Sequence, residues 1–209
     1  LFRISLPGAI EQALIQASFI AVNVIISTLD TTSEAAYRIL INLESISYMP
    51  AVGISIAAAT LTGKPLGEND AETAYRTGRQ STIMGLVWGL IMGGLFLVFL
   101  TYWPRLFTRD PSVIGAIIPV LMLSAFLQPF LNAMLVMSGV LRGSGNTRAV
   151  MHLSFFRVWL INVPLAYLFI RVLRFDLKGA WYAELISYTL FSGIMYFKIL
   201  QKKWTEIEI

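Results

Sequence analysis

The sequence predicts an all-α polytopic membrane protein with six transmembrane helices. Of its 209 residues, 56% are hydrophobic and only 13% are charged, a balance that soluble domains of this length rarely reach. The mean hydropathy of +0.70 comes from six long apolar runs separated by short polar turns. At about 20 residues per crossing, six crossings with their turns use nearly the whole chain, so we expect no separate soluble domain.

The six predicted crossings end at turns rich in glycine, proline or charged residues. They cover about residues 4–28, 35–61, 81–101, 112–141, 148–173 and 180–200. Between the second and third crossings we expect a short surface helix over residues 69–80, capped by Asn69. The last residues, 206–209, are expected to be a loose tail. Because the chain begins at Leu1 without a methionine, we expect a fragment that enters in the middle of a longer protein.

The first crossing carries a polar stripe on one helical face. Gln12, Gln16 and Asn23 fall close together at about 100° per residue. Lipid cannot satisfy side-chain amides, so this stripe is predicted to line a cavity or face other helices. Glu11 lies to one side of the stripe and is a candidate for binding a coupling ion.

The second crossing combines an acid with a helix-bending proline. Glu44, Tyr48 and Ser55 share one face, and a charge within hydrocarbon costs roughly 2.5–3.5 kcal/mol unless it faces protein or water. We therefore interpret Glu44 as a proton or sodium site and Tyr48 and Ser55 as cavity lining. Pro50 and Gly53 are the candidate hinge, because proline removes a helical hydrogen bond. The alternative is a kinked packing helix whose acid lies near the outer interface.

The third and fourth crossings contrast in composition. Gly85, Gly89 and Gly93 recur every four residues and predict close packing against a neighbouring helix. In the fourth crossing Gln128 and Asn132 recur on one face without an acid. We predict that these two amides also line the cavity, since they cannot face lipid.

The last two crossings also carry polar residues at membrane depth. Arg157 lies well inside the fifth crossing, at a depth of roughly 10–14 Å that Glu11 also reaches. We hypothesise that the two pair, since an unpaired arginine is costly in a membrane; the pair could serve structure alone. Glu184 and Tyr188 lie along one side of the sixth crossing. Both are candidate cavity residues, although Glu184 is close enough to the outer interface for water to solvate it.

The basic residues predict the orientation. Nine lysines and arginines lie at the ends of the crossings shared with the termini, and six lie at the opposite ends. Arg157 inside the membrane completes the total of 16. Because cytoplasmic loops carry the excess of positive charge, both termini are predicted to be cytoplasmic.

Several classes of function are disfavoured. There is no cysteine and only one histidine, His152, which argues against disulfides, thiolate chemistry and a histidine-built metal site. No nucleophile–base set exists, so we expect neither an enzyme nor a bound cofactor. The lysines and arginines report membrane topology, so we expect no nucleic-acid partner.

Three motifs together resemble a known family. Leu6-Pro7 precedes Glu11-Gln12 in the first crossing, and Gly139 to Thr147 reads GVLRGSGNT. The second crossing contributes the series Glu44, Met49-Pro50, Gly53, Ala57-Ala58-Ala59, Gly63, Leu66-Gly67, Asp70 and Ala74. In order and spacing these motifs resemble the seventh, eighth and tenth helix regions of MATE (multidrug and toxic compound extrusion) transporters.

The resemblance implies the C-terminal six-helix lobe of a twelve-helix antiporter that lacks its N-terminal lobe here. That family exports cationic, lipophilic compounds in exchange for H⁺ or Na⁺ across a bacterial or archaeal inner membrane. The expected partners are such substrates, membrane lipids and the missing lobe. Glu11 and Glu44 match positions at which members carry acids. Many members have a further acid in the tenth helix, where this chain has only Gln128 and Asn132.

Two other functions remain open. A flippase for lipid-linked oligosaccharides should show several cationic residues facing the cavity to hold a pyrophosphate, and only Arg157 qualifies. A non-transporting membrane scaffold would not depend on Glu44.

Overall fold

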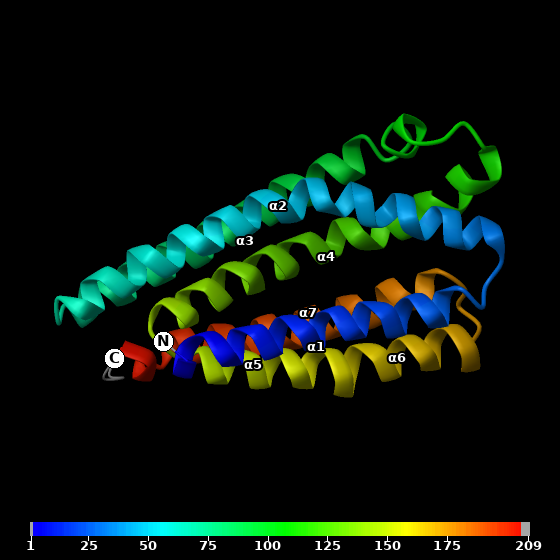
Figure 1. The fold of residues 1–209 in the computed structure, drawn as a ribbon. Coiled ribbons are helices and arrows are strands. Elements are labelled where there is room, and N and C mark those ends of the chain that lie inside the picture. The colour runs from blue at the N-terminus through cyan, green and yellow to red at the C-terminus, as the bar shows by residue number, and fades with distance from the viewer. Residues whose placement is uncertain (1, 206–209) are drawn as a thin grey trace.

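The computed structural model describes residues 2–205, and within that part every regular element is helical (Figure 1). The long helices are α1 (Phe2–Ile26), α2 (Thr31–Gly67), α3 (Ala71–Val98), α4 (Pro111–Gly143) and α7 (Lys178–Leu200). The fifth long segment comprises α5 (Thr147–Phe155), the π-helical η2 (Phe156–Asn162), α6 (Val163–Tyr167) and the π-helical η3 (Leu168–Val172). The short 3-10 turns η1 (Pro104–Leu106) and η4 (Lys203–Thr205) complete the fold. The all-α prediction is confirmed, and the expected tail over residues 206–209 lies outside the described residues.

Five of the long segments are apolar enough to cross a membrane. They are Gly8–Ile26 within α1, then α2, α3, α4 and the segment Thr147–Val172. The sixth, α7, has 23 residues, which corresponds to roughly 34 Å of helix. It lies alongside the others in the bundle (Figure 1), but Lys178, Glu184 and Lys198 interrupt its apolar run. The described part of the chain therefore has six long segments, and α7 is the one that is not apolar enough to count as a candidate span.

The expectation of a separate surface helix at residues 69–80 is wrong. α3 begins at Ala71 and continues without a break to Val98. Asp70, and not Asn69, caps it, since the Asp70 Oδ1 atom accepts a hydrogen bond from the backbone N–H of Thr73 at 3.0 Å. No proline follows in the sequence to stop this helix before the membrane.

α4 is the axis of the bundle, packing against α2, α3 and α7. It contributes to both apolar cores, which form two clusters along its length. One cluster includes Leu40, Ile117 and Trp181, and the other includes Val140 and Ile199. The surrounding helices are therefore held together because each of them packs on α4.

The glycine stripe of α3 packs directly on α4, as predicted. Cβ atoms at Gly85, Gly89 or Gly93 would collide with α4, and at Gly93 the obstacle is the backbone carbonyl of Ala125. Pro129 lies four residues after Ala125 and has no N–H to bond that carbonyl. The bare backbone of α3 thus covers the site where α4 lacks a helical hydrogen bond.

A second close contact joins α2 to α4. A Cβ atom at Gly139 would meet the Ser55 backbone, and one at Gly143 would meet the Ala59 backbone. The Ser55 hydroxyl also donates a hydrogen bond to the Leu135 carbonyl at 2.7 Å. Small residues therefore bring the two backbones together beside the region of α2 that contains Pro50.

α2 is continuous through Pro50 and bends near its middle (Figure 1). The proline has no N–H, and its ring disturbs the hydrogen bonding of the preceding turn. Trp88 of α3 donates its indole N–H to the Ser47 carbonyl in that turn at 2.9 Å. The tryptophan thereby provides a hydrogen bond to the disturbed turn from a neighbouring helix.

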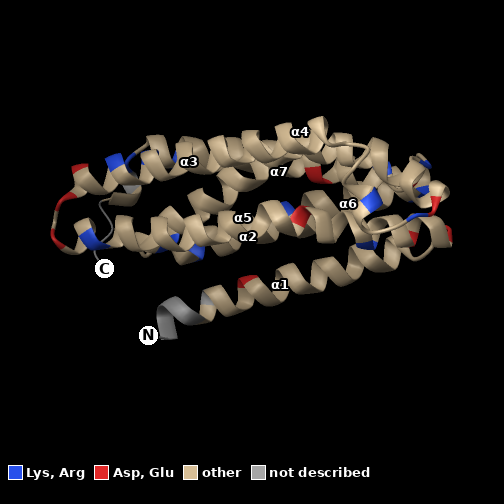
Figure 2. Ribbon diagram, turned by 90° about the horizontal axis from the view of Figure 1, so that it is seen from above, with Lys and Arg blue, Asp and Glu red and all other residues tan. Residues whose placement is uncertain are grey.

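The described ends of the chain lie at the same end of the bundle (Figure 1). Charged residues concentrate at the two ends, and only a few lie near the middle (Figure 2). This distribution fits a bundle whose long axis crosses the bilayer, with ionisable groups at the interfaces.

Candidate functional site

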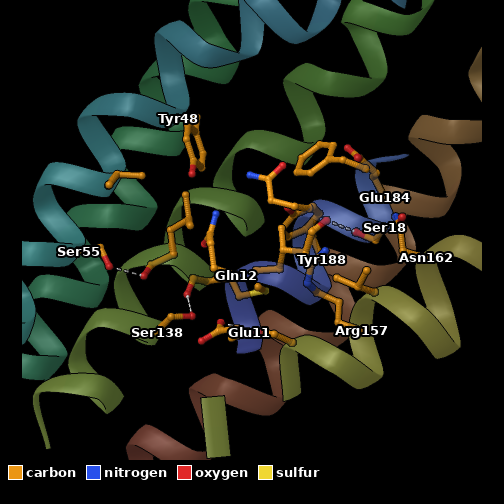
Figure 3. Close-up of a pocket in the computed structure, with 18 of the residues that line it drawn as sticks. Glu11, Gln12, Ser18, Tyr48, Ser55, Ser138, Arg157, Asn162, Glu184 and Tyr188 are labelled. Atoms are coloured by element: carbon orange, nitrogen blue, oxygen red, sulfur yellow. Dashed lines mark hydrogen bonds between the residues drawn. The ribbon is translucent and has the colours of Figure 1, made fainter. Parts of the chain in front are cut away.

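A pocket of about 290 Å³ lies between α1, α2, α4, α5, η2 and α7 (Figure 3). Most of the predicted cavity residues lie in its wall. Its polar and charged lining consists of Glu11, Gln12, Gln16, Ser18, Tyr37, Tyr48, Ser55, Ser138, Arg142, Ser154, Arg157, Asn162, Glu184 and Tyr188. Residues far apart in the sequence thus meet at one polar hollow inside an apolar bundle.

Glu11 is held at one edge of this pocket and is only 4% exposed. One of its carboxylate oxygens, Oε1, accepts hydrogen bonds from Arg142 Nη2 at 2.8 Å and from the Ser154 hydroxyl at 2.7 Å. The hypothesis that Glu11 pairs with Arg157 is therefore wrong, because Arg142 is its ion partner. α4 continues to Gly143, and this places Arg142 on the helix, facing α1, where the sequence suggested the start of a turn.

Arg157 points elsewhere. Its guanidinium carbon lies 4.3 Å from the centre of the Tyr188 ring, a cation–π contact. The residue is only 7% exposed, and its Nε atom has no hydrogen-bond partner in the part of the chain described. Arg157 lies in the π-helical η2, a local widening that often occurs at functional sites.

Glu44 belongs to a separate buried cluster and does not line the pocket. Its Oε1 atom accepts hydrogen bonds from the Ser124 hydroxyl and from Trp181 Nε1, the latter at 2.8 Å. The Gln128 amide donates to the same Ser124 hydroxyl at 3.1 Å. One carboxylate therefore ties α2 to both α4 and α7. Sequence reasoning did not identify Ser124 and Trp181 as its partners, although Ser124 follows the same four-residue spacing as Gln128 and Asn132.

Three predicted cavity residues lie outside the pocket wall. Gln128 and Asn132 are fully buried between helices, where the Asn132 amide donates to the Ser47 hydroxyl of α2 at 3.0 Å. Asn23 is exposed, and its amide donates to the Phe19 carbonyl of its own helix at 2.8 Å. In each residue the amide N–H group donates to a protein partner, whereas the Asn132 Oδ1 atom is buried without a partner in the described part of the chain.

Glu184 does line the pocket, so bulk water at an outer interface is not its main surroundings. It lies one turn after Trp181 on α7, on the side of the helix that faces Glu44. Glu44 and Arg157 each lie near enough to Glu184 to interact with it electrostatically. An ionisable group of the buried carboxylate cluster therefore interacts with an ionisable group of the pocket wall.

The proposed hinge lies within the part of α2 that lines the pocket. Pro50 and Gly53 are exposed on the side of α2, and a Cβ atom at Gly53 would meet nothing within 4 Å. On the same helix Glu44 and the wall residue Tyr48 precede this bend, and Ser55 of the pocket wall follows it. A change in the bend would thus move the later part of the α2 wall relative to the buried carboxylate.

A metal centre built from several acidic, histidine or cysteine ligands is absent from residues 2–205. The oxygen atoms around Glu44 are a carboxylate and a hydroxyl, which are ligand types suited to hard cations. Binding a proton, in contrast, requires only the carboxylate of Glu44.

The model of the MatE family matches residues 7–168 of this chain. The chain is similar to a probable multidrug resistance protein NorM of Thermotoga maritima, with 32% identity over 205 residues. That match covers 98% of this chain and 44% of the relative. A second relative, a probable multidrug resistance protein NorM of Mannheimia succiniciproducens, is 26% identical over 212 residues, covering 99% of this chain and 46% of the relative.

Solved structures show the same fold. An outward-facing multidrug resistance MATE family transporter of the MOP superfamily superimposes with a TM-score of 0.90 at 22% identity, covering 99% of this chain and 46% of that chain. The MATE transporter ClbM in complex with Rb⁺ gives a TM-score of 0.86 at 18% identity, covering 96% and 48%. The chain thus spans a little under half the length of the proteins it matches.

Proposed function

Because this chain belongs to the MatE family of membrane transporters, we propose that it works as one lobe of a multidrug exporter. In this proposal the complete transporter exports cationic, lipophilic compounds in exchange for H⁺ or Na⁺ by alternating access. The second lobe, absent from this chain, supplies the opposite wall of the cavity. The names of the relatives as multidrug resistance proteins support the substrate class.

The observation that carries the proposal is the hydrogen-bonded Glu44. When ionised, its carboxylate accepts from Ser124 of α4 and Trp181 of α7, and so holds α2 against both helices. Protonation or a bound cation competes for the same oxygen lone pairs and weakens these contacts. The coupling ion then alters how α2 is held just before its bend at Pro50, and this shifts the balance between cavity conformations.

The pocket supports the substrate class through its aromatic and acidic walls. Tyr48 and Tyr188 line it, and aromatic rings attract organic cations. One face of the Tyr188 ring is already covered by Arg157. Glu184 adds a carboxyl group to the same wall. The volume of about 290 Å³ is at the lower end of the range for drug-sized pockets, which fits a cavity completed by a second lobe.

The outer surface supports a lipid environment. Large apolar side chains such as Ile20, Leu90 and Val98 are exposed in this chain by itself, and they suit contact with acyl chains or with the second lobe. We place the transporter in the inner membrane of a bacterium or archaeon with both ends of this chain on the cytoplasmic side. The excess of basic residues at that end supports the orientation.

Of the alternatives, a flippase for lipid-linked oligosaccharides is disfavoured by charge. The described pocket wall contains two arginines, and Arg142 is already paired with Glu11. A pyrophosphate would therefore meet a single available cation, Arg157. A scaffold without transport activity makes a different prediction for Glu44, which the following experiment tests.

The experiment uses the complete transporter in proteoliposomes, with pH and sodium gradients imposed separately. Glu44→Gln keeps the size of the side chain and removes the titratable group, so gradient-driven export of ethidium should fall to background. Glu34→Gln is the matched control, because Glu34 is partly exposed and pairs with Arg38 on its own helix; it should retain export. Unchanged export by Glu44→Gln would overturn the role of Glu44 in coupling, and an absence of export from the unmodified transporter would support the scaffold. The gradient that drives export identifies the coupling ion.

A further inference from the structure

A chain of hydrogen bonds leaves α2 at Glu44, follows α4 and returns to α2 one turn later. Ser124 of α4 donates to the Glu44 carboxylate, and Gln128 Nε2 donates to the Ser124 hydroxyl at 3.1 Å. Asn132 Nδ2 donates to Gln128 Oε1 at 3.3 Å and to the Ser47 hydroxyl at 3.0 Å. Every member of this chain is buried, and none lines the pocket. Because water does not reach these groups, a change at one member is passed to the next.

The hydrogen bonds along α4 all have the same sense. Asn132 donates to Gln128, Gln128 to Ser124, and Ser124 to Glu44. An ionised carboxylate only accepts hydrogen bonds, so it imposes this sense on the chain. A protonated carboxyl group can donate through its O–H group, and hydroxyl and amide side chains can each donate or accept. The same side chains can therefore form the reversed chain when Glu44 carries a proton.

Asn132 shows that the described arrangement is not the only favourable one. Its Oδ1 atom is buried without a partner in the described part of the chain, and an unused buried acceptor is unfavourable. If the amides of Gln128 and Asn132 both turn over, this Oδ1 atom takes the place of Nδ2 and accepts from Gln128 Nε2 and from Ser47. The Nδ2 atom then gives up its bond to the Gln128 carbonyl, which is 2.9 Å long in the present arrangement. Each arrangement leaves one Asn132 atom unpaired, so the protonation of Glu44 decides between them.

We propose that Gln128 and Asn132 are positioning residues that transmit the protonation of Glu44 to Ser47. The proton stays on Glu44, whose O–H group then donates to Ser124, while the two amides turn over and Ser47 changes from acceptor to donor. This inference rests on the proposed function and specifies H⁺ as its coupling ion, because a carboxylate that binds sodium has no O–H group with which to donate.

Ser47 is placed where such a change affects the bend of α2. It lies three residues before Pro50, and its backbone carbonyl accepts the indole N–H of Trp88 at 2.9 Å. Hydrogen bonds made by serine hydroxyls influence helix bending. Reversing the bond at Ser47 therefore changes the polar contacts of the turn that the proline already disturbs.

The other ionisable groups near Glu44 are on α2 and α7. Tyr37 on α2, and Glu184 and Tyr188 on α7, interact with it electrostatically. Arg157 of η2 interacts with Glu184 and Tyr188. Residues 81–98 of α3 and 111–141 of α4 include no ionisable side chain. A pH response that is transmitted through α4 can thus be assigned to Glu44 if Glu44→Gln removes it.

The test measures amide hydrogen exchange over residues 51–54 in the detergent-solubilised complete transporter at a series of pH values. The N–H groups of these residues face the carbonyls of residues 47–50. After correction for the intrinsic effect of pH, the exchange rate in the unmodified protein should change by about fivefold as Glu44 takes its proton, the effect of one hydrogen bond. Glu44→Gln should remove this step.

Two variants interrupt the chain without touching Glu44. Gln128→Met keeps the length of the side chain and removes both amide groups, so the step should disappear. Ser47→Ala removes only the last hydroxyl and leaves the contacts of Glu44 in place; it should also lose the step, and it keeps the test valid if Gln128→Met does not fold. Gln80→Met is the matched control, because Gln80 is exposed on α3; it should retain the step.

The outcomes separate the relay from the proposed function. A step that persists in both Gln128→Met and Ser47→Ala would overturn the relay and show that Glu44 acts directly on its own turn. An equal increase of exchange at every pH in these variants would show a purely structural role and also overturn it, as would the absence of a step in the unmodified protein. If only a sodium gradient drives export, the relay fails and the exporter stands. If Glu44→Gln retains export, the coupling role of Glu44 fails together with the relay.

Discussion

Glu11 and Arg142 form an ion pair that joins α1 to α4. The acid is almost fully buried, whereas the side chain of Arg142 is 43% exposed. Arg142→Gln leaves the Glu11 carboxylate with the Ser154 hydroxyl as its remaining partner, so the variant should lose about 2 kcal/mol of stability. The loss should appear as a lower thermal unfolding midpoint of the purified protein.

Exchanging the charges tests whether the two residues act as a pair. Combining Glu11→Arg with Arg142→Glu should raise the thermal unfolding midpoint part of the way back toward that of the unmodified protein. The same exchange between Glu11 and Arg157 should not recover it, because these residues do not pair. Arg148→Gln removes a nearby exposed arginine and should leave the midpoint unchanged. Recovery by the Arg157 exchange would contradict the pairing described here.

Asp70 is a second residue whose charge affects local structure, at the start of α3. The hydrogen bond from Thr73 holds the pKa of the Asp70 carboxyl below its ordinary value of 3.8. Because the folded-state pKa is lowered, its capping contribution is present at neutral pH. It begins to fade as the pH falls below that ordinary value, and it is lost below the lowered pKa.

The consequence is a pH-dependent difference between Asp70→Ala and the unmodified chain. At neutral pH the variant should show faster amide hydrogen exchange over residues 71–74, because the first turn of α3 loses its cap. Once the pH falls below the lowered pKa of Asp70 the difference should disappear, since the native aspartate is then protonated. Glu68→Ala changes a neighbouring exposed acid and should behave like the unmodified chain. A difference that persists undiminished at low pH would show that the charge is not responsible.

At the scale of the elements, the contact between α3 and α4 is tested by two adjacent glycines. Gly93 faces the Ala125 carbonyl of α4, whereas a Cβ atom at Gly94 would meet nothing within 4 Å. Gly93→Ala should therefore destabilise the bundle by about 1–3 kcal/mol through overpacking. Gly94→Ala should be neutral or stabilise by up to about 1 kcal/mol, because alanine favours the helix.

Thermal unfolding of both variants is the measurement. The same methyl group is added at neighbouring positions, so helix propensity cannot account for a difference between them. Similar midpoints for the two variants would mean that the backbones of α3 and α4 are not in direct contact.

At the scale of the whole molecule, the pocket has walls from one lobe only. Its lining comes from helices of this chain, and the alternating access proposed above requires a second rigid body that moves against the first. We predict that the 209-residue chain alone, reconstituted in proteoliposomes under a pH or sodium gradient, exports no ethidium. The complete transporter, prepared in parallel, is the positive control. Measurable export by the chain alone would refute the prediction.

The sequence by itself determined the class of fold, because the relevant information is local. Long apolar runs and the turns between them predict helices wherever they later pack. The glycine spacing at Gly85, Gly89 and Gly93 marked a close contact, since only a bare backbone face allows one. The cost of burying charge also singled out Glu11, Glu44 and Arg157 before their neighbours were known.

Only the tertiary structure decided which side chains meet. Helical periodicity shows which residues share a face, and it does not show which other helix covers that face. Glu11 therefore has Arg142 as its partner and not Arg157, and Gln128 and Asn132 are buried between helices instead of lining a cavity. The physical reason is that hydrogen bonds and ion pairs form at about 3 Å, a precision that depends on how six long segments pack and not on the spacing within any one of them.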